Sequence, residues 1–203
     1  MKEKLKYKTQ KDRIIPASRV VAIGASTGGP KAIEELFRGF SGPLKAGIIL
    51  TQHMPAGFTR SFAERLNLIS KFPVKEAEEG DVVQGGMAFI AHGGYHLEIK
   101  EKGIIHLNDG PLVEYVRPSA DVMMKSAVRV YGSNIIGVVL TGMGRDGAEG
   151  MDAIRKAGGK TIVQDEATST IYGMPRAVVE RGAADMILPL SKIAQKIEEL
   201  LSI

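Results

Sequence analysis

Short apolar runs that end in glycine-rich loops limit what this chain can fold into more than any other feature. Val20–Ile23 is one such run, with the pattern of a short strand buried on both faces. The loop Gly24–Gly29 follows, and a proline then opens a predicted helix over 30–38. The same order of strand, loop and helix recurs from Gly47 and from Ile135. Strands separated by single helices pair in parallel, so the sequence predicts an α/β fold with a doubly wound, mostly parallel sheet flanked by helices.

The middle of the chain departs from this order. Residues 82–107 contain short alternating apolar runs, and a Glu-Lys-Gly turn at 101–103 separates two of them. Alternation around a short turn is typical of antiparallel strands, so we expect an antiparallel β-hairpin inserted at about 82–107. A helix over 120–131, with Ser119 as its N-cap, then leads back to the α/β pattern.

The positive charge of the chain is concentrated at one end. The 203 residues include 27 Lys and Arg and 23 Asp and Glu, for a net charge of +4. Residues 1–19 hold seven of the basic residues and two of the acids, which leaves residues 20–203 with a net charge of −1. We therefore expect a basic linker or flexible N-terminus at 1–19 and one folded domain at 20–203. No aromatic platform or nucleic-acid motif accompanies the basic segment, so we expect no nucleic-acid partner.

Composition also limits the compartment and the chemistry. The chain has no cysteine, which excludes thiol catalysis and disulfides. No apolar run reaches the roughly 18 residues that a membrane span needs. The N-terminus is too polar for a secretory signal. We expect a cytoplasmic protein with no direct membrane insertion.

The first loop carries a serine in a suggestive position. Gly24–Gly28 fits the pattern G-x-S-x-G, which is typical of nucleophilic serines, and it places Ser26 at the carboxyl end of a predicted strand. The loop matches neither the dinucleotide-binding pattern nor a P-loop. Taken alone, five residues favour a general turn or phosphate-binding role over a nucleophile.

Two further polar residues follow predicted buried strands. His53 comes after the strand at 47–51, and Asp146 lies in the glycine-rich loop after the strand at 135–140. These strand ends converge on one edge of a doubly wound sheet. A serine becomes nucleophilic when a histidine takes its proton and a carboxylate orients the imidazole. Each residue also has a simpler role, with His53 ending a strand and Asp146 capping a helix. Their coincidence with Ser26 favours a triad, in an order that differs from that of α/β-hydrolases.

The remaining histidines do not indicate a metal site. His92 and His96 are four residues apart, but two glycines lie between them in strand-like sequence, so they do not share a helical face. His106 lies on a predicted hairpin strand. We assign no metal and no cofactor.

Three segments of the chain resemble the CheB family, the protein-glutamate methylesterases and glutamine deamidases of bacterial chemotaxis. The segments are Ile23–Gly29, Thr51–Ala63 and Leu140–Ala148, and shorter matches occur at Arg117–Ser119 and Gly173–Arg176. The resemblance covers essentially all of residues 20–200. It implies a serine hydrolase that removes methyl groups from glutamate methyl esters on methyl-accepting chemotaxis receptors and also deamidates receptor glutamines, in chemotaxis adaptation.

The resemblance also implies roles for particular residues. Ser26 would be the nucleophile, His53 the general base and then acid, and Asp146 the carboxylate that orients His53. Thr27 and Met143 would line the active site, with backbone N–H groups around them forming the oxyanion hole. For such a triad we expect His53 to lie about 2.6–3.2 Å from both Ser26 and Asp146.

Partners follow from the same resemblance. The substrate would be the cytoplasmic domain of a chemotaxis receptor, and the enzyme is expected to be a monomer. Family members usually carry an N-terminal receiver domain, which the chemotaxis histidine kinase phosphorylates. No receiver is found in this sequence, so residues 1–19 would be the end of its linker, and the sequence is either a catalytic domain cut from a longer chain or a stand-alone version. Two other functions stay open on the residues alone. A small-molecule esterase would need a deep apolar pocket near Ser26, and a nucleotide-binding module would give no role to His53 and Asp146.

Overall fold

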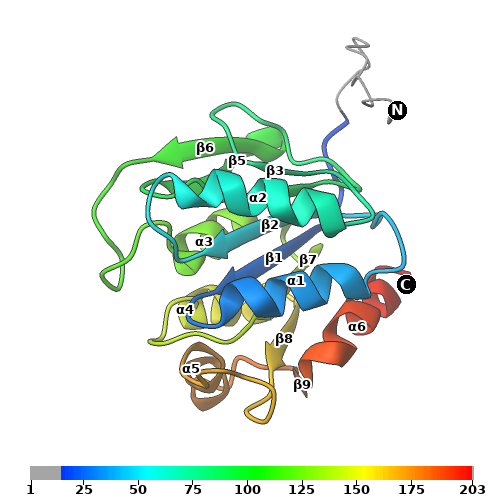
Figure 1. Cartoon of the computed structure of the whole chain (residues 1–203), viewed down its shortest axis with the longest axis vertical. Coiled ribbons are helices and arrows are strands. Elements are labelled where there is room, and N and C mark those ends of the chain that lie inside the picture. The colour runs from blue at the N-terminus through cyan, green and yellow to red at the C-terminus, as the bar shows by residue number, and fades with distance from the viewer. Residues whose placement is uncertain (1–14, 203) are drawn as a thin grey trace.

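A computed structural model describes residues 15–202 of the chain (Figure 1). Its strands are β1 (Val20–Ala25), β2 (Gly47–Gln52), β3 (Val74–Glu76), β4 (Ala88–Ile90), β5 (His96–Lys100), β6 (Ile104–Asn108), β7 (Ile135–Val139), β8 (Lys160–Gln164) and β9 (Met186–Leu188). Its helices are α1 (Gly29–Gly39), α2 (Phe58–Ile69), α3 (Ala120–Tyr131), α4 (Ala148–Lys156), α5 (Met174–Glu180) and α6 (Leu190–Ser202). A short 3-10 turn, Glu101–Gly103, joins β5 to β6.

Seven strands form one sheet in the order β3-β4-β2-β1-β7-β8-β9, and every pair in it is parallel. Helices α1, α2 and α6 cover one face, and α3, α4 and α5 cover the other (Figure 1). The predicted doubly wound α/β fold is confirmed. Strand β1 is central, with β2 on one side and β7 on the other, so the strand order reverses there. Open α/β sheets bind their ligands beside such a reversal, at the carboxyl ends of the strands.

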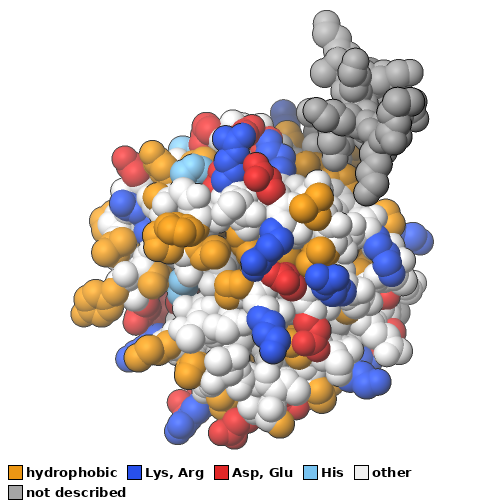
Figure 2. Space-filling view, in the orientation of Figure 1, with side chains coloured by type: hydrophobic (Ala, Val, Ile, Leu, Met, Phe, Trp, Pro, Cys, Tyr) orange, Lys and Arg blue, Asp and Glu red, His pale blue; other side chains and the backbone are white. Residues whose placement is uncertain are grey.

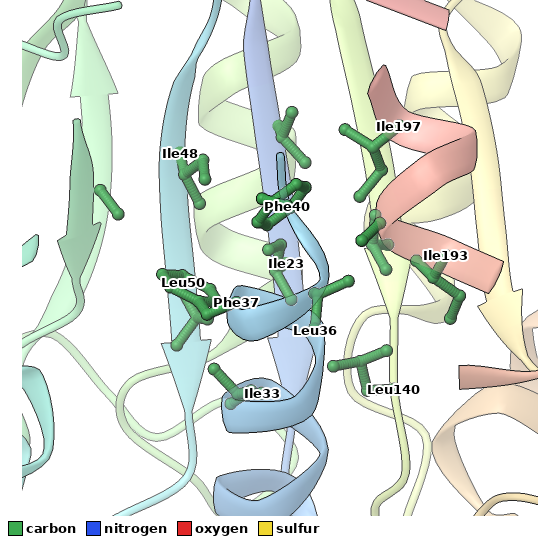
Figure 3. Packing of buried hydrophobic residues seen from close by; sticks show 14 of the residues in the cluster. Ile23, Ile33, Leu36, Phe37, Phe40, Ile48, Leu50, Leu140, Ile193 and Ile197 are labelled. Atoms are coloured by element: carbon green, nitrogen blue, oxygen red, sulfur yellow. The ribbon is translucent and has the colours of Figure 1, made fainter. Parts of the chain in front are cut away.

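The core lies on both sides of the sheet because the side chains of each strand alternate between its faces. Along β1, Val21 and Ile23 face α1 and α6, whereas Val20 and Ala22 face α3 and α4. Figure 3 shows the first of these clusters, in which Phe37 of α1 packs between the helix and the sheet. Burying a side chain of this size contributes about 1.5–3 kcal/mol of transfer free energy. The packed core therefore holds in place the strands whose loops form the site.

The antiparallel hairpin is confirmed, but it is shorter than predicted. It consists of β5 and β6, which pair from His96↔Asn108 to Lys100↔Ile104. The earlier part of the predicted region belongs elsewhere, since β4 pairs in parallel with β2 and β3. All three residues of β4 are buried, whereas β5 and β6 mix buried residues with half-buried and exposed ones. A short, wholly apolar run suits a strand covered on both faces, and mixed burial suits a hairpin with one solvated face.

The predicted basic segment at 1–19 lies mostly outside the described residues. Of its last part, Ala17 donates a backbone hydrogen bond to Val83 (2.8 Å), and Pro16 forms an isolated bridge with Gln84. Within residues 15–202, no helix is long and apolar enough to cross a membrane.

Candidate active site

Three loops meet at the carboxyl edge of the central strands. Ser26 follows β1, His53 follows β2, and Asp146 lies in the loop after β7. Backbone hydrogen bonds hold the loops to one another: the N–H of His53 donates to Ala25 (3.1 Å), and the N–H of Ser26 donates to Thr141 (3.0 Å). The structure therefore brings together three residues that are far apart in the sequence, at the edge where the sequence predicts a site.

The carboxylate of Asp146 is buried and fully bonded. It accepts hydrogen bonds from His53 Nε2 (2.7 Å), from the hydroxyl of Ser119 (2.6 Å), and from the backbone N–H groups of Ala120 (2.6 Å) and Asp121 (3.0 Å). The two backbone donors belong to the first turn of α3, where the helix dipole favours a negative charge. Burial by itself would raise the pKa of Asp146. The hydrogen bonds from His53, Ser119 and Asp121 outweigh burial, and the pKa of Asp146 is lowered below its usual value.

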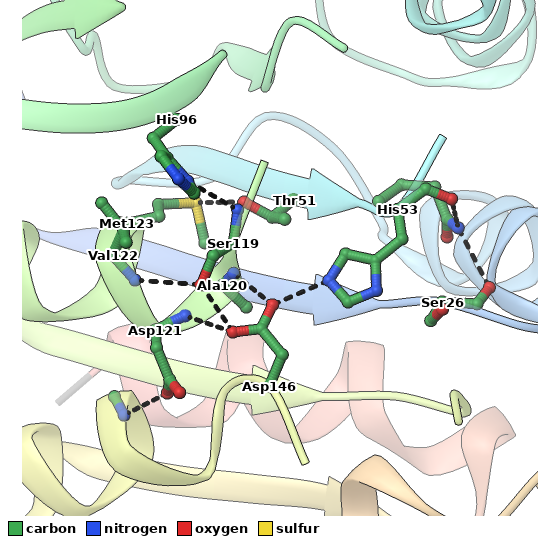
Figure 4. Close-up of polar contacts among 12 residues, drawn as sticks. Ser26, Thr51, His53, His96, Ser119, Ala120, Asp121, Val122, Met123 and Asp146 are labelled. Atoms are coloured by element: carbon green, nitrogen blue, oxygen red, sulfur yellow. Dashed lines mark hydrogen bonds and ion pairs between the residues drawn. The ribbon is translucent and has the colours of Figure 1, made fainter. Parts of the chain in front are cut away.

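The imidazole of His53 lies between Asp146 and Ser26 (Figure 4). Its Nε2 donates to Asp146, which is ionised, so the proton belongs on Nε2 and Nδ1 is left free to accept. Figure 4 shows the second ring nitrogen on the side of Ser26. The expected contact with Asp146 is present. The expected hydrogen bond between Ser26 Oγ and His53 is not formed among the described residues. A serine hydroxyl turns about a single bond, and such contacts often tighten only when substrate binds.

Gln52 is a residue of this site that the sequence analysis missed. Its side-chain Nε2 donates to the backbone carbonyls of Ser26 (3.0 Å) and His53 (3.1 Å), so one buried amide ties two of the loops together. A Cβ on Gly29 would lie 1.9 Å from Gln52 Oε1, which explains the glycine at that position. The only signal in the sequence was the place of Gln52 at a strand end, directly before His53.

Thr27 and Met143 lie at the rim of the site. Both are exposed, and Met143 has 75% of its surface accessible. Their backbone N–H groups have no hydrogen-bond acceptor within residues 15–202. The loop before Met143 packs tightly on the serine, because a Cβ on Gly142 would lie 2.8 Å from Ser26 Cβ and 2.3 Å from Met174 Sδ. The free N–H of Thr27 is next to Ser26 in the chain, and the close approach of the Gly142 loop brings that of Met143 to the same side of the sheet edge.

The other histidines take structural roles. His96 is buried, accepts a hydrogen bond from the backbone N–H of Ser119 (3.1 Å) and donates to the carbonyl of Pro111 (2.9 Å). His106 pairs with Glu79 at the surface, and His92 stacks edge-on against Tyr95. In the described part of the chain, no three His, Cys, Asp or Glu side chains gather as a metal site would require.

Comparison with known proteins places the chain in a family. The CheB methylesterase family model matches residues 21–197. A Pyrococcus horikoshii protein named protein-glutamate methylesterase/protein-glutamine glutaminase is 53% identical over 93% of this chain and 52% of its own length. A Pseudomonas aeruginosa protein of the same name, numbered 2, is 47% identical over 89% of this chain and 52% of its own length. The chain thus spans about half the length of these relatives.

A solved structure agrees with these matches. The crystal structure of the Thermotoga maritima CheB methylesterase catalytic domain is 41% identical and superposes with a TM-score of 0.85, over 90% of this chain and 98% of that one. The sequence resemblance to the CheB family is confirmed on both sequence and fold. The chain belongs to the CheB methylesterase family.

Proposed function

We propose that residues 20–203 form the catalytic unit of a serine hydrolase that demethylates glutamate methyl esters on methyl-accepting chemotaxis receptors and deamidates receptor glutamines. The observation that carries the proposal is the pairing of His53 Nε2 with the buried Asp146 at 2.7 Å, on the sheet edge that also holds Ser26. The names of the relatives support the substrate. The site of action would be the cytoplasm.

The first half of the reaction forms an acyl-enzyme. The hydroxyl of Ser26 attacks the γ-carbonyl carbon of the glutamate methyl ester while Nδ1 of His53 takes its proton. Asp146 stays ionised and stabilises the imidazolium through Nε2. The negative oxygen of the tetrahedral intermediate accepts hydrogen bonds from the backbone N–H groups of Thr27 and Met143, and one such donor lowers the barrier by about 3 kcal/mol. The methoxy group then leaves as methanol, with the proton from His53.

The second half releases the enzyme. His53 takes a proton from a water molecule, whose oxygen attacks the ester carbon on Ser26. The bond to Ser26 breaks, its oxygen recovers the proton from His53, and the product is a free glutamate side chain. With a glutamine substrate the same steps release ammonia in place of methanol.

The open shape of the site favours a polypeptide substrate over a small ester. Small-molecule sites bury most of their ligand in a concave pocket. Here Met143 (75% exposed) and Tyr115 (93% exposed) stand at the rim, so the edge is accessible to a large partner. We also propose that a receiver domain, phosphorylated by a chemotaxis histidine kinase, regulates access to this edge of the sheet.

Methanol release from methylated receptor signalling domains tests the proposal. We expect release by the unaltered protein and a loss of at least about a thousandfold in Ser26→Ala, with ammonia release from glutamine-bearing receptors falling in parallel. Ser202→Ala is the matched control, since its hydroxyl is exposed and donates only to Glu198 within α6. Retained activity in Ser26→Ala would remove Ser26 as the nucleophile. Absence of methanol with every receptor would show that the substrate is wrong.

A further inference from the structure

The segment between β6 and α3 forms one wall of a hollow that reaches His53. The hollow has a volume of about 310 Å³, and its lining includes His53, Met54, Leu112, Tyr115 and Pro118. Figure 2 shows hydrophobic side chains gathered on this side of the molecule, over the loop that joins β6 to α3 and the loop that joins β2 to α2. The apolar surface is therefore continuous with the proposed catalytic histidine.

The backbone at the tip of this segment is strained. Val113 and Val116 exchange two backbone hydrogen bonds (3.1 and 3.0 Å), and the two residues between them, Glu114 and Tyr115, both have positive φ (48° and 63°). Two successive positive φ angles define a turn that Asn-Gly fits well and that a bulky residue disfavours. Tyr115 nevertheless occupies it with 93% of its surface exposed, so its ring gains almost no burial within the chain.

Hydrogen bonds tie the base of the segment to the catalytic carboxylate. His96 donates to the carbonyl of Pro111 (2.9 Å) and accepts from the N–H of Ser119 (3.1 Å), whose hydroxyl donates to Asp146 (2.6 Å). Arg117 also holds the segment by donating to the carbonyl of Gly110 (2.6 Å). The turn is therefore fixed in position relative to His53.

We propose that the turn Leu112–Val116 is a docking arm for the polypeptide that carries the scissile ester. The proposal rests on the proposed function, because the chain on either side of a modified glutamate bound at Ser26 must lie along the edge of the site. Apart from Arg117, the side chains of this segment that line the wall beside His53 are hydrophobic, so apolar side chains next to that glutamate pack on Leu112 and Tyr115. A second copy of this chain seated there would cover His53. The strained turn thus presents an exposed aromatic ring beside His53, where the chain next to a bound glutamate would pass.

A variant with a relaxed turn separates docking from catalysis and from folding. Tyr115→Gly removes the ring, installs the residue that a positive φ prefers and keeps the ion pair between Glu114 and Arg145 (3.6 Å), so the thermal midpoint should not fall. We expect kcat/KM for methanol release from a methylated receptor fragment to fall at least tenfold more than kcat/KM for p-nitrophenyl acetate, mainly through KM. Leu112→Ala should act in the same direction. Leu68→Ala, which truncates an 84% exposed leucine near the far end of α2, should alter neither substrate.

The outcomes distinguish the two proposals. A KM-dominated loss confined to the receptor fragment supports the docking arm. Equal losses on both substrates overturn it, because the turn then acts only on the structure of the site. Unchanged methanol release in both variants also overturns it and leaves the proposed function standing. If the unaltered protein hydrolyses the small ester but releases no methanol, the proposed function fails, and the docking arm fails with it.

Discussion

The hydroxyl of Ser119 donates a hydrogen bond to Asp146 Oδ1 (2.6 Å) and also accepts one from the backbone N–H of Val122 (3.4 Å). Ser119 is therefore the N-cap of α3 and a direct support of the carboxylate that orients His53. The start of one helix and the position of the proposed triad depend on the same oxygen atom.

Replacing Ser119 with alanine should weaken both stability and turnover. The loss of an N-cap bond and of a buried donor should lower the free energy of unfolding by about 1–2 kcal/mol. Activity should fall only about tenfold, because Asp146 keeps its bonds to His53, Ala120 and Asp121 and the imidazole is displaced only slightly. Urea unfolding and methanol release measure the two effects, with Ser202→Ala as the control. Unchanged stability in Ser119→Ala would contradict the capping role.

Gln52→Met should reduce turnover with little change in overall fold. The substitution keeps the length of the side chain but removes the donor that holds the carbonyls of Ser26 and His53. If Ser26 is the nucleophile, as we propose, a small displacement of its hydroxyl raises the barrier, so we expect kcat to fall about 10- to 100-fold. Gln195→Met, at an exposed position on α6, is the control. Full activity in Gln52→Met would show that the backbone bonds alone position Ser26.

Asp121 should make stability depend on pH. Burial raises the pKa of Asp121 to about 6, and the nearby Asp146 adds to the rise, although the N–H of Gly150 opposes it. The ordinary value is 3.8, so between about pH 4 and pH 6 the native state keeps a proton that the unfolded chain has lost. Stability should therefore fall as the pH rises through this window, by up to about 3 kcal/mol at roughly 1.4 kcal/mol per pKa unit.

Asp121→Asn tests this pH dependence. The amide oxygen can still accept from Gly150, which donates to Asp121 at 2.6 Å, but the side chain no longer titrates. We expect the fall in unfolding free energy between pH 4 and pH 6 to become smaller, and stability at pH 7 to rise by about 1–3 kcal/mol. Asp109→Asn, at an exposed aspartate, should leave the pH profile as it was. An identical profile in Asp121→Asn would contradict the assignment.

The sequence was sufficient to predict the sheet and the place where the three polar residues meet. Val20–Ile23 and Ile135–Leu140 are short apolar runs followed by glycine-rich loops, which favours buried strands, and the carboxyl ends of parallel strands lie on one edge of the sheet. The sequence was not sufficient to predict how the short strands pair or which side chains from distant parts of the chain are in contact. Three residues in β4 have no periodicity, so their pairing with β2 depends on tertiary context.

The contacts around the carboxylate show why the rest of the site was missed. Ser119 is predicted as an N-cap from its local sequence, but its bond to Asp146 spans 27 residues, and the bond of Gln52 to Ser26 spans 26. The conformation of the proposed docking arm, Leu112–Val116, could not be predicted from the sequence for a different reason. Glu114 and Tyr115 are poor residues for positive φ, so local propensity argues against the conformation that the fold imposes on them.

The most direct test of the account asks whether Ser26 and His53 act as one unit. The rates of methanol release by Ser26→Ala, His53→Ala and the double variant should be compared with that of the unaltered protein. Residues of a triad lose nearly all of their effect when either is removed, so the two single variants should be similarly impaired, and the double variant should lose only a few-fold more. Losses that multiply in the double variant would mean that the two residues act independently, and would contradict the triad.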